Sequence, residues 1–72
     1  MSPHETSTVK VIELVGESSE SWEDAAEQAL RDASETIDEI SGVDIVGQTA
    51  SVEDNQIVQY RSTVHVTFPI QR

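Results

Sequence analysis

The sequence predicts a small α+β domain of order β-α-β-β, with one three-stranded antiparallel sheet wrapped around one helix. Three observations lead to this prediction. A β-branched, apolar run from Thr8 to Val15 comes first, and an amphipathic stretch from Ser18 to Gly42 follows. From residue 43 onward, apolar and polar residues alternate as they do in strands. Residues 1–7 are polar and contain Pro3, so we expect a flexible N-terminal tail ahead of a single domain over residues 8–72.

The first strand is expected over Thr8–Val15, with Gly16 ending it. The helix is expected from Ser18 to Gly42, where Ser18 or Ser21 would cap its start and Gly42 would end it. Apolar residues recur there three and four positions apart, which predicts one buried stripe: Trp22, Ala26, Ala29, Leu30, Ala33, Ile37 and Ile40. The other faces of the helix carry mostly carboxylates.

The second half of the chain predicts a hairpin, with strands over residues 43–52 and 57–70 joined by a turn at Glu53–Gln56. Gly47 is a candidate bulge. One face of the last strand is apolar except for one serine: Val58, Tyr60, Ser62, Val64, Val66 and Phe68. We expect this face to cover the helix and to bury Trp22, Leu30, Ile37 and Ile40 against Val58, Tyr60, Val64 and Phe68.

Size and charge narrow the function classes. A chain of 72 residues without cysteine has a marginal core when alone, and the bare outer face of the sheet therefore predicts a closed homo-oligomer. The net charge of −10 disfavours nucleic acid as a partner. It fits a surface adapted to high salt, divalent cation binding, or an ordinary acidic protein. No apolar run is long enough to span a membrane, and no signal sequence is visible, so a cytoplasmic location is expected.

No arrangement of nucleophile and base is visible and no Gly-rich phosphate loop occurs, so we expect no enzyme activity. His65 and Arg61 share the outer face of the last strand, where they are expected to line an interface. Arg61 would pair with an acid of a neighbouring subunit or contact a ligand. Asp44, Glu53 and Asp54 are candidate cation ligands if symmetry brings copies together.

Over residues 8–70 the chain resembles the dodecin family. The resemblance lies in Lys10–Gly16, in Ser18 and Ser21–Ala26, and in the second hairpin strand with Tyr60-Arg61 and Val64–Phe68. Dodecins are small β-α-β-β proteins that assemble as hollow homododecamers, so the resemblance implies the same assembly here.

The resemblance also implies a ligand. Well-known dodecins bind and store flavin (FMN or riboflavin), stacked between tryptophans at subunit interfaces. The corresponding interface pocket here would contain Gly42, Asp44, Gln48 and Arg61. Gly42 occupies the position of the stacking tryptophan, Arg61 that of a flavin-binding glutamine, and Thr49 that of a basic residue. This pattern is similar to a branch of the family that lacks the tryptophan, which includes a calcium-binding type. Flavin storage, a calcium or other cation-binding cage, and a purely structural assembly are the three hypotheses.

Overall fold

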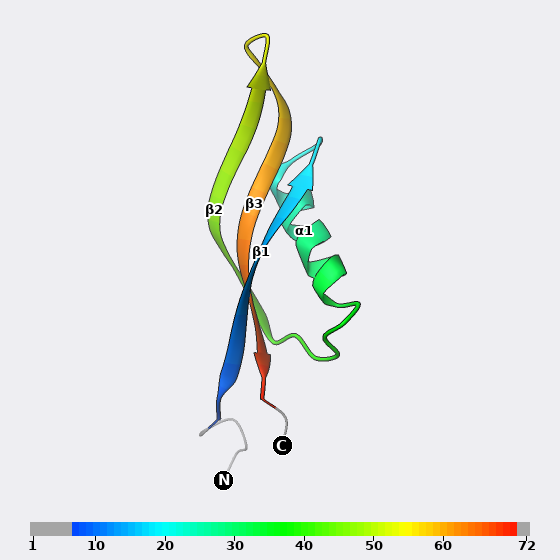
Figure 1. Cartoon of the computed structure of the whole chain (residues 1–72), viewed down its shortest axis with the longest axis vertical. Coiled ribbons are helices and arrows are strands. Elements are labelled where there is room, and N and C mark those ends of the chain that lie inside the picture. Colours follow the sequence, from blue (N-terminus) through cyan, green and yellow to red (C-terminus); the bar gives the residue numbers. More distant parts are fainter. Residues whose placement is uncertain (1–6, 71–72) are drawn as a thin grey trace.

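The fold is the predicted β-α-β-β arrangement, with one helix on one face of a three-stranded antiparallel sheet (Figure 1). The computed structural model describes residues 7–70, and the elements are β1 (Val9–Ser18), α1 (Trp22–Ala33), β2 (Gly42–Glu53) and β3 (Gln56–Pro69). The strand order is β1-β3-β2, so the last strand lies in the middle of the sheet. The predicted N-terminal tail lies outside the described residues except for Ser7.

The β2–β3 hairpin projects beyond the rest of the sheet (Figure 1). Pairing between β1 and β3 runs from Val9 opposite Pro69 to Ser18 opposite Tyr60, so the hairpin continues past β1 as a two-stranded ribbon. Asp54 and Asn55 form its turn with positive φ angles of 53° and 63°. Two positive φ angles define a type I′ turn, whose twist matches that of the flanking strands.

A bulge interrupts β2 close to the predicted position. The register shifts between Ile45 and Gly47, which leaves Val46 as the extra residue beside the glycine that the sequence indicated. Because one residue is added, even-numbered side chains of β2 point to one face of the sheet before Val46 and to the opposite face after it. A second register shift lies between Ser51 and Val52.

The helix is shorter than predicted at both ends. Ser21 caps it by accepting a hydrogen bond from Asp24 N, as one of the two candidate caps would, while Ser18 belongs to β1. Gly16, which was expected to end β1, lies within that strand, and Gly42 begins β2 instead of ending the helix. The helix ends at Ala33, where the last turn tightens: Glu35 N donates to Asp32 O, Thr36 N donates to Ala33 O, and Ser34 Oγ donates to Arg31 O.

The core consists of small residues. Ala26, Ala29 and Ala33 of α1 are buried against Val64 and Val66 of β3, and Ile37 and Ile40 pack against this cluster from the loop after α1. Ala25 is buried where α1 meets Gly16 of β1. The predicted burial of Leu30 and Val58 is wrong, since they are 36% and 41% exposed. A Cβ atom at Gly16 would lie 1.8 Å from Ala25 O, so α1 packs too close to β1 for larger side chains at the contact.

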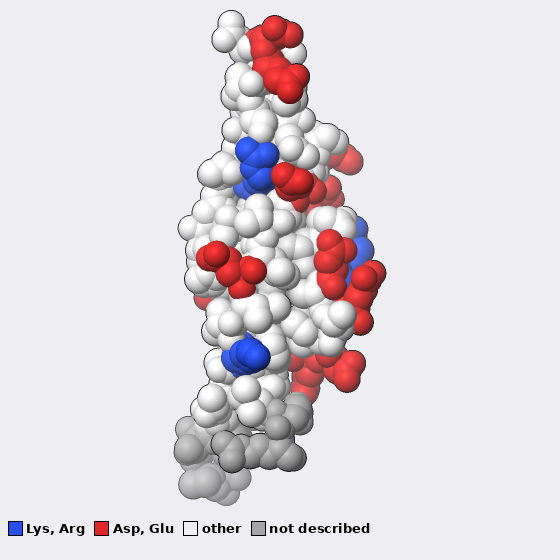
Figure 2. Space-filling model, in the orientation of Figure 1, with Lys and Arg blue, Asp and Glu red and all other residues white. Residues whose placement is uncertain are grey.

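The surface is strongly acidic on the side of the helix. In the orientation of Figure 1, carboxylates gather over α1 and at the tip of the hairpin, with few basic side chains between them (Figure 2). Inside the fold, Ser62 is fully buried and its Oγ donates to Trp22 O over 2.7 Å. Within residues 7–70, α1 is too short and too polar to cross a bilayer.

Candidate functional site

The face of the sheet turned away from α1, here called the outer face, holds most of the residues that the sequence singled out. Val64 and Val66 of β3 are fully buried under the helix, so the alternate side chains of β3 point to the outer face: Gln59, Arg61, Thr63, His65 and Thr67. Directly opposite residues of neighbouring strands share a face. The strand register therefore gives the other members of this surface.

One row across the three strands is ionisable. His65 lies opposite Glu13 of β1 and opposite Asp44 of β2. His65 Nε2 and Glu13 Oε2 are 2.9 Å apart, and the two side chains are 39% and 62% exposed. Asp44 is exposed as well. The row thus places an imidazole between two carboxylates on an open face.

A second row contains Arg61, which lies opposite Glu17 of β1 and Thr49 of β2. Its Nη1 lies 3.5 Å from Glu17 Oε2 and donates to Gln59 Oε1 over 3.4 Å. The acid that the sequence analysis placed on a neighbouring subunit therefore has a counterpart within the chain. Glu17 thus gives the guanidinium a counter-charge within the chain at a partly exposed position.

Gly42 and Gly47, the outer-face positions of β2 on either side of Asp44, carry no side chains. Gly42 lies opposite Thr67, and a Cβ built on it would meet Thr67 Oγ1 at 2.9 Å. Gly47 lies opposite Thr63, and its Cβ would have only ordinary contacts, 3.7 Å from Thr63 Cβ. Around Asp44 and His65, the outer face therefore has glycines on β2 and threonines on β3, while Val11 and Val15 flank the row on β1.

The structure does not bring all predicted site residues together. Gly42, Asp44 and Arg61 share the outer face, whereas Gln48 lies opposite the buried Ser62 and so belongs to the helix side of the sheet. Glu53 and Asp54 lie at the hairpin tip, roughly 30 Å along β2 from Asp44. Within residues 7–70, no three His, Asp or Glu side chains already converge as a metal cluster.

All three aromatic residues of the chain lie away from the outer face. Tyr60 and Phe68 belong to the helix side of β3, and the Trp22 ring meets Tyr60 edge to face with centroids 4.8 Å apart. Trp22 Nε1 also donates to the backbone oxygen of Thr49 over 2.9 Å. The outer face of a single chain therefore has no aromatic ring on which a planar ligand could stack.

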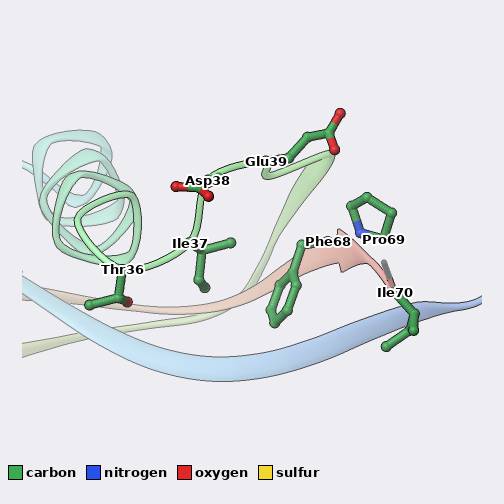
Figure 3. Close-up of a pocket in the computed structure, with 7 residues that line it drawn as sticks. All are labelled: Thr36, Ile37, Asp38, Glu39, Phe68, Pro69 and Ile70. Carbon is green, nitrogen blue, oxygen red and sulfur yellow. The ribbon is translucent and has the colours of Figure 1, made fainter. Parts of the chain in front are cut away.

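A groove of about 720 Å³ opens between the loop after α1 and the end of β3 (Figure 3). Ile37, Phe68, Pro69 and Ile70 give it apolar walls, and Thr36, Asp38 and Glu39 line it from the loop. This groove was not predicted from the sequence, because the helical spacing of apolar residues extends over residues 34–41, which form a loop.

Sequence reasoning also missed the partners of His65 and Arg61. Glu13 and Glu17 read as ordinary solvent-facing residues of an edge strand, and only the β1–β3 register places them against the central strand. The available signal was their spacing: Glu13 and Glu17 lie two positions from Val15, and Glu13 also lies two positions from Val11, as residues on one face of a strand do. It indicates a shared face but does not indicate which β3 residues lie opposite.

Comparison with known proteins gives a consistent result. The Dodecin family model matches residues 8–71. A curated relative named calcium dodecin, from Mycobacterium tuberculosis, is 32% identical over 65 residues, which cover 90% of this chain and 92% of that protein. A crystal structure described as calcium chelating antigen, calcium dodecin, from the same organism and with a novel calcium-binding site, is 32% identical. It has a TM-score of 0.79 and covers 90% of this chain and 93% of that one. The dodecin of Streptomyces coelicolor has the same fold, with a TM-score of 0.88 at 22% identity, covering 94% of this chain and 97% of that chain.

Proposed function

The chain belongs to the dodecin family, and on that basis we propose that it forms a closed homododecamer that binds calcium at carboxylates contributed by several subunits. The relative named calcium dodecin supports the choice of ion, since 32% identity extends over nine-tenths of this chain. The function is binding and storage by a cage of subunits, without a catalytic step. The chain is assigned by this proposal to a branch of the family without the flavin-stacking tryptophan.

The observation that carries the proposal is the absence of an aromatic ring on the outer face combined with its carboxylates. A flavin stacked between tryptophans gains about 0.5–1.5 kcal/mol per aromatic pair beyond the burial of area. Here Gly42 stands where the resemblance places that tryptophan, and all three aromatic residues of the chain lie elsewhere. Calcium needs six to eight oxygen ligands and no aromatic surface.

Self-association is supported by the surface that a single chain leaves exposed. Both edges of the sheet, β1 and β2, are unpaired and carry exposed apolar side chains: Val9, Val11, Val15, Val43, Ile45, Val46 and Val52. Long edge strands of this kind readily pair with other chains unless they are covered. A closed assembly covers them and adds the apolar burial that the small core of alanine and valine lacks.

The carboxylates proposed for calcium are Asp44, Glu53 and Asp54. Glu53 and Asp54 are neighbours at the exposed hairpin tip, and Asp44 lies far from them along β2. One chain therefore supplies only part of a calcium coordination sphere at either place. The remaining oxygen ligands would come from symmetry-related copies, so calcium binding and assembly are expected to be coupled.

Calorimetric titration of calcium into chelator-treated protein tests this function. We expect binding that is weakened by Glu53→Gln with Asp54→Asn or by Asp44→Asn, and that is unchanged by Glu27→Gln on the exposed face of α1. Equal effects of all these substitutions would indicate a general charge effect and overturn the assignment of the ligands. Absence of calcium binding, together with quenching of riboflavin or FMN fluorescence, would restore flavin as the ligand. Absence of both would leave a structural assembly.

A further inference from the structure

We propose that the row Glu13–His65–Asp44 on the outer face binds a divalent transition-metal ion of the zinc or nickel class. This site shares Asp44 with one of the proposed calcium positions but differs from it in chemistry, since its central ligand is an imidazole nitrogen. Calcium is bound in proteins by oxygen, whereas imidazole suits zinc, copper and nickel. The inference stands on the contacts of the single chain and does not require the proposed calcium function.

Two of the ligands already meet. His65 Nε2 and Glu13 Oε2 are 2.9 Å apart. Donor atoms of a tetrahedral zinc site with bonds of about 2.0–2.1 Å lie about 3.3 Å from each other. To share one ion, the two atoms would separate by a few tenths of an ångström, and the imidazole would turn so that Nε2 points at the ion instead of at Glu13 Oε2. In the single chain, side-chain exposures of 39% and 62% leave this position uncovered.

Asp44 is placed to supply a third ligand. It lies directly opposite His65 on the other neighbouring strand, where Cβ atoms of paired residues are about 4.5–5.5 Å apart. In the described part of the chain its carboxylate does not yet converge with the other two groups. The glycines at positions 42 and 47 leave it free to turn toward His65, because neither carries a side chain that would obstruct it. Water would complete the coordination.

The surroundings favour a cation over other ligands. The neighbours of the row on the outer face are uncharged: Val11, Val15, Thr63 and Thr67 with the two glycines. Among the described residues of this face, Arg61 is the basic side chain that comes nearest along β3, four positions from His65, and it is paired with Glu17. Among residues 7–70, no ammonium or guanidinium group therefore lies between the two carboxylates of the row.

Cobalt(II) is a suitable probe, because its visible absorption bands report nitrogen and oxygen ligands directly. The chain has two histidines, so the experiment uses the full chain carrying His4→Gln, which leaves His65 alone. We expect cobalt bands that zinc abolishes by displacement. His65→Asn should remove them, Glu13→Gln should weaken affinity about tenfold or more, and Asp44→Asn should weaken it as well. Glu53→Gln is the matched control and should leave the titration unchanged.

Size-exclusion chromatography and circular dichroism of each variant separate loss of ligand from loss of fold. Absence of cobalt bands in the His4→Gln protein would overturn the proposal, as would bands that persist in His65→Asn. A calcium titration of His65→Asn distinguishes the two sites, because we expect calcium binding to survive this substitution. Cobalt binding that depends on His65, in a protein that binds no calcium, would overturn the proposed function and support this site.

Discussion

Replacing Gly16 by alanine is expected to destabilise the protein more than any other single added methyl group in the sheet. The new Cβ would lie 1.8 Å from Ala25 O, 2.9 Å from Ala25 C and 3.1 Å from Ala29 Cβ. Carbon atoms in contact are normally about 3.5–4.0 Å apart, so α1 and β1 would have to separate by roughly 1.5 Å. The nearest atoms are backbone, which cannot rotate away as the end of a side chain can.

Overpacking of this kind costs typically about 1–3 kcal/mol in the free energy of unfolding, and backbone contact places Gly16→Ala at the upper end. Thermal unfolding at fixed protein concentration measures the effect. A loss of about 3 kcal/mol in a domain of 60–100 residues lowers Tm by roughly 12–24 °C, at about 4–8 °C per kcal/mol.

Gly47→Ala is the matched control for Gly16→Ala. It adds the same methyl group to the same sheet, but its Cβ meets Thr63 Cβ at an ordinary 3.7 Å. Alanine also reduces the freedom of the unfolded chain, so Gly47→Ala should be neutral or slightly stabilising. Equal melting temperatures of the two variants would refute the argument that close packing of α1 on Gly16 determines the small core.

Three further predictions follow from the same contacts. Ser62→Ala removes the buried hydrogen bond to Trp22 O and should cost about 0.5–1.5 kcal/mol in denaturant unfolding, while Ser19→Ala, at an exposed position, should cost nothing measurable. Gly42→Trp should quench riboflavin fluorescence where the unsubstituted chain does not, because the resemblance places the stacking tryptophan at Gly42 and a closed assembly supplies a second copy of the ring; absence of quenching would contradict this. Assembly should weaken in dilute buffer, because each subunit carries a net charge of −10 and low salt screens it less; light scattering across a salt series that finds a stable dodecamer in dilute buffer would contradict this.

Much of the fold could be predicted because its signals are local. Alternation identified the two hairpin strands, and the polar residues between them identified the turn. The helix was predicted too long because Ile37 and Ile40 keep the helical spacing although they lie in the following loop. Periodicity indicates which residues face the core, and a loop that packs on the same core continues the pattern. The tight last turn after Asp32, in which Glu35 N and Thr36 N donate to carbonyls three residues back, left no signal in the spacing of apolar residues.

The candidate site could be predicted only in part, because it depends on pairing between distant strands. Alternation along β3 placed Arg61 and His65 on one face, but the acids beside them come from β1, some fifty positions away. Gln48 was grouped with Gly42 and Asp44, and the extra residue at Val46 moves it to the other face. A single inserted residue reverses the orientation of every side chain that follows it on a strand.

Small residues have a different effect on each face of the sheet. On the helix side, Gly16 lets α1 approach so closely that alanines form the core, which leaves Leu30 and the apolar edges of the sheet uncovered. On the outer face, Gly42 and Gly47 leave open the space around Asp44 and His65 that larger side chains would fill. The first effect makes the single chain depend on neighbours for apolar burial. The open outer face presents polar and ionisable side chains to those neighbours and no aromatic rings. For this reason we expect the assembled protein to bind ions and not planar rings.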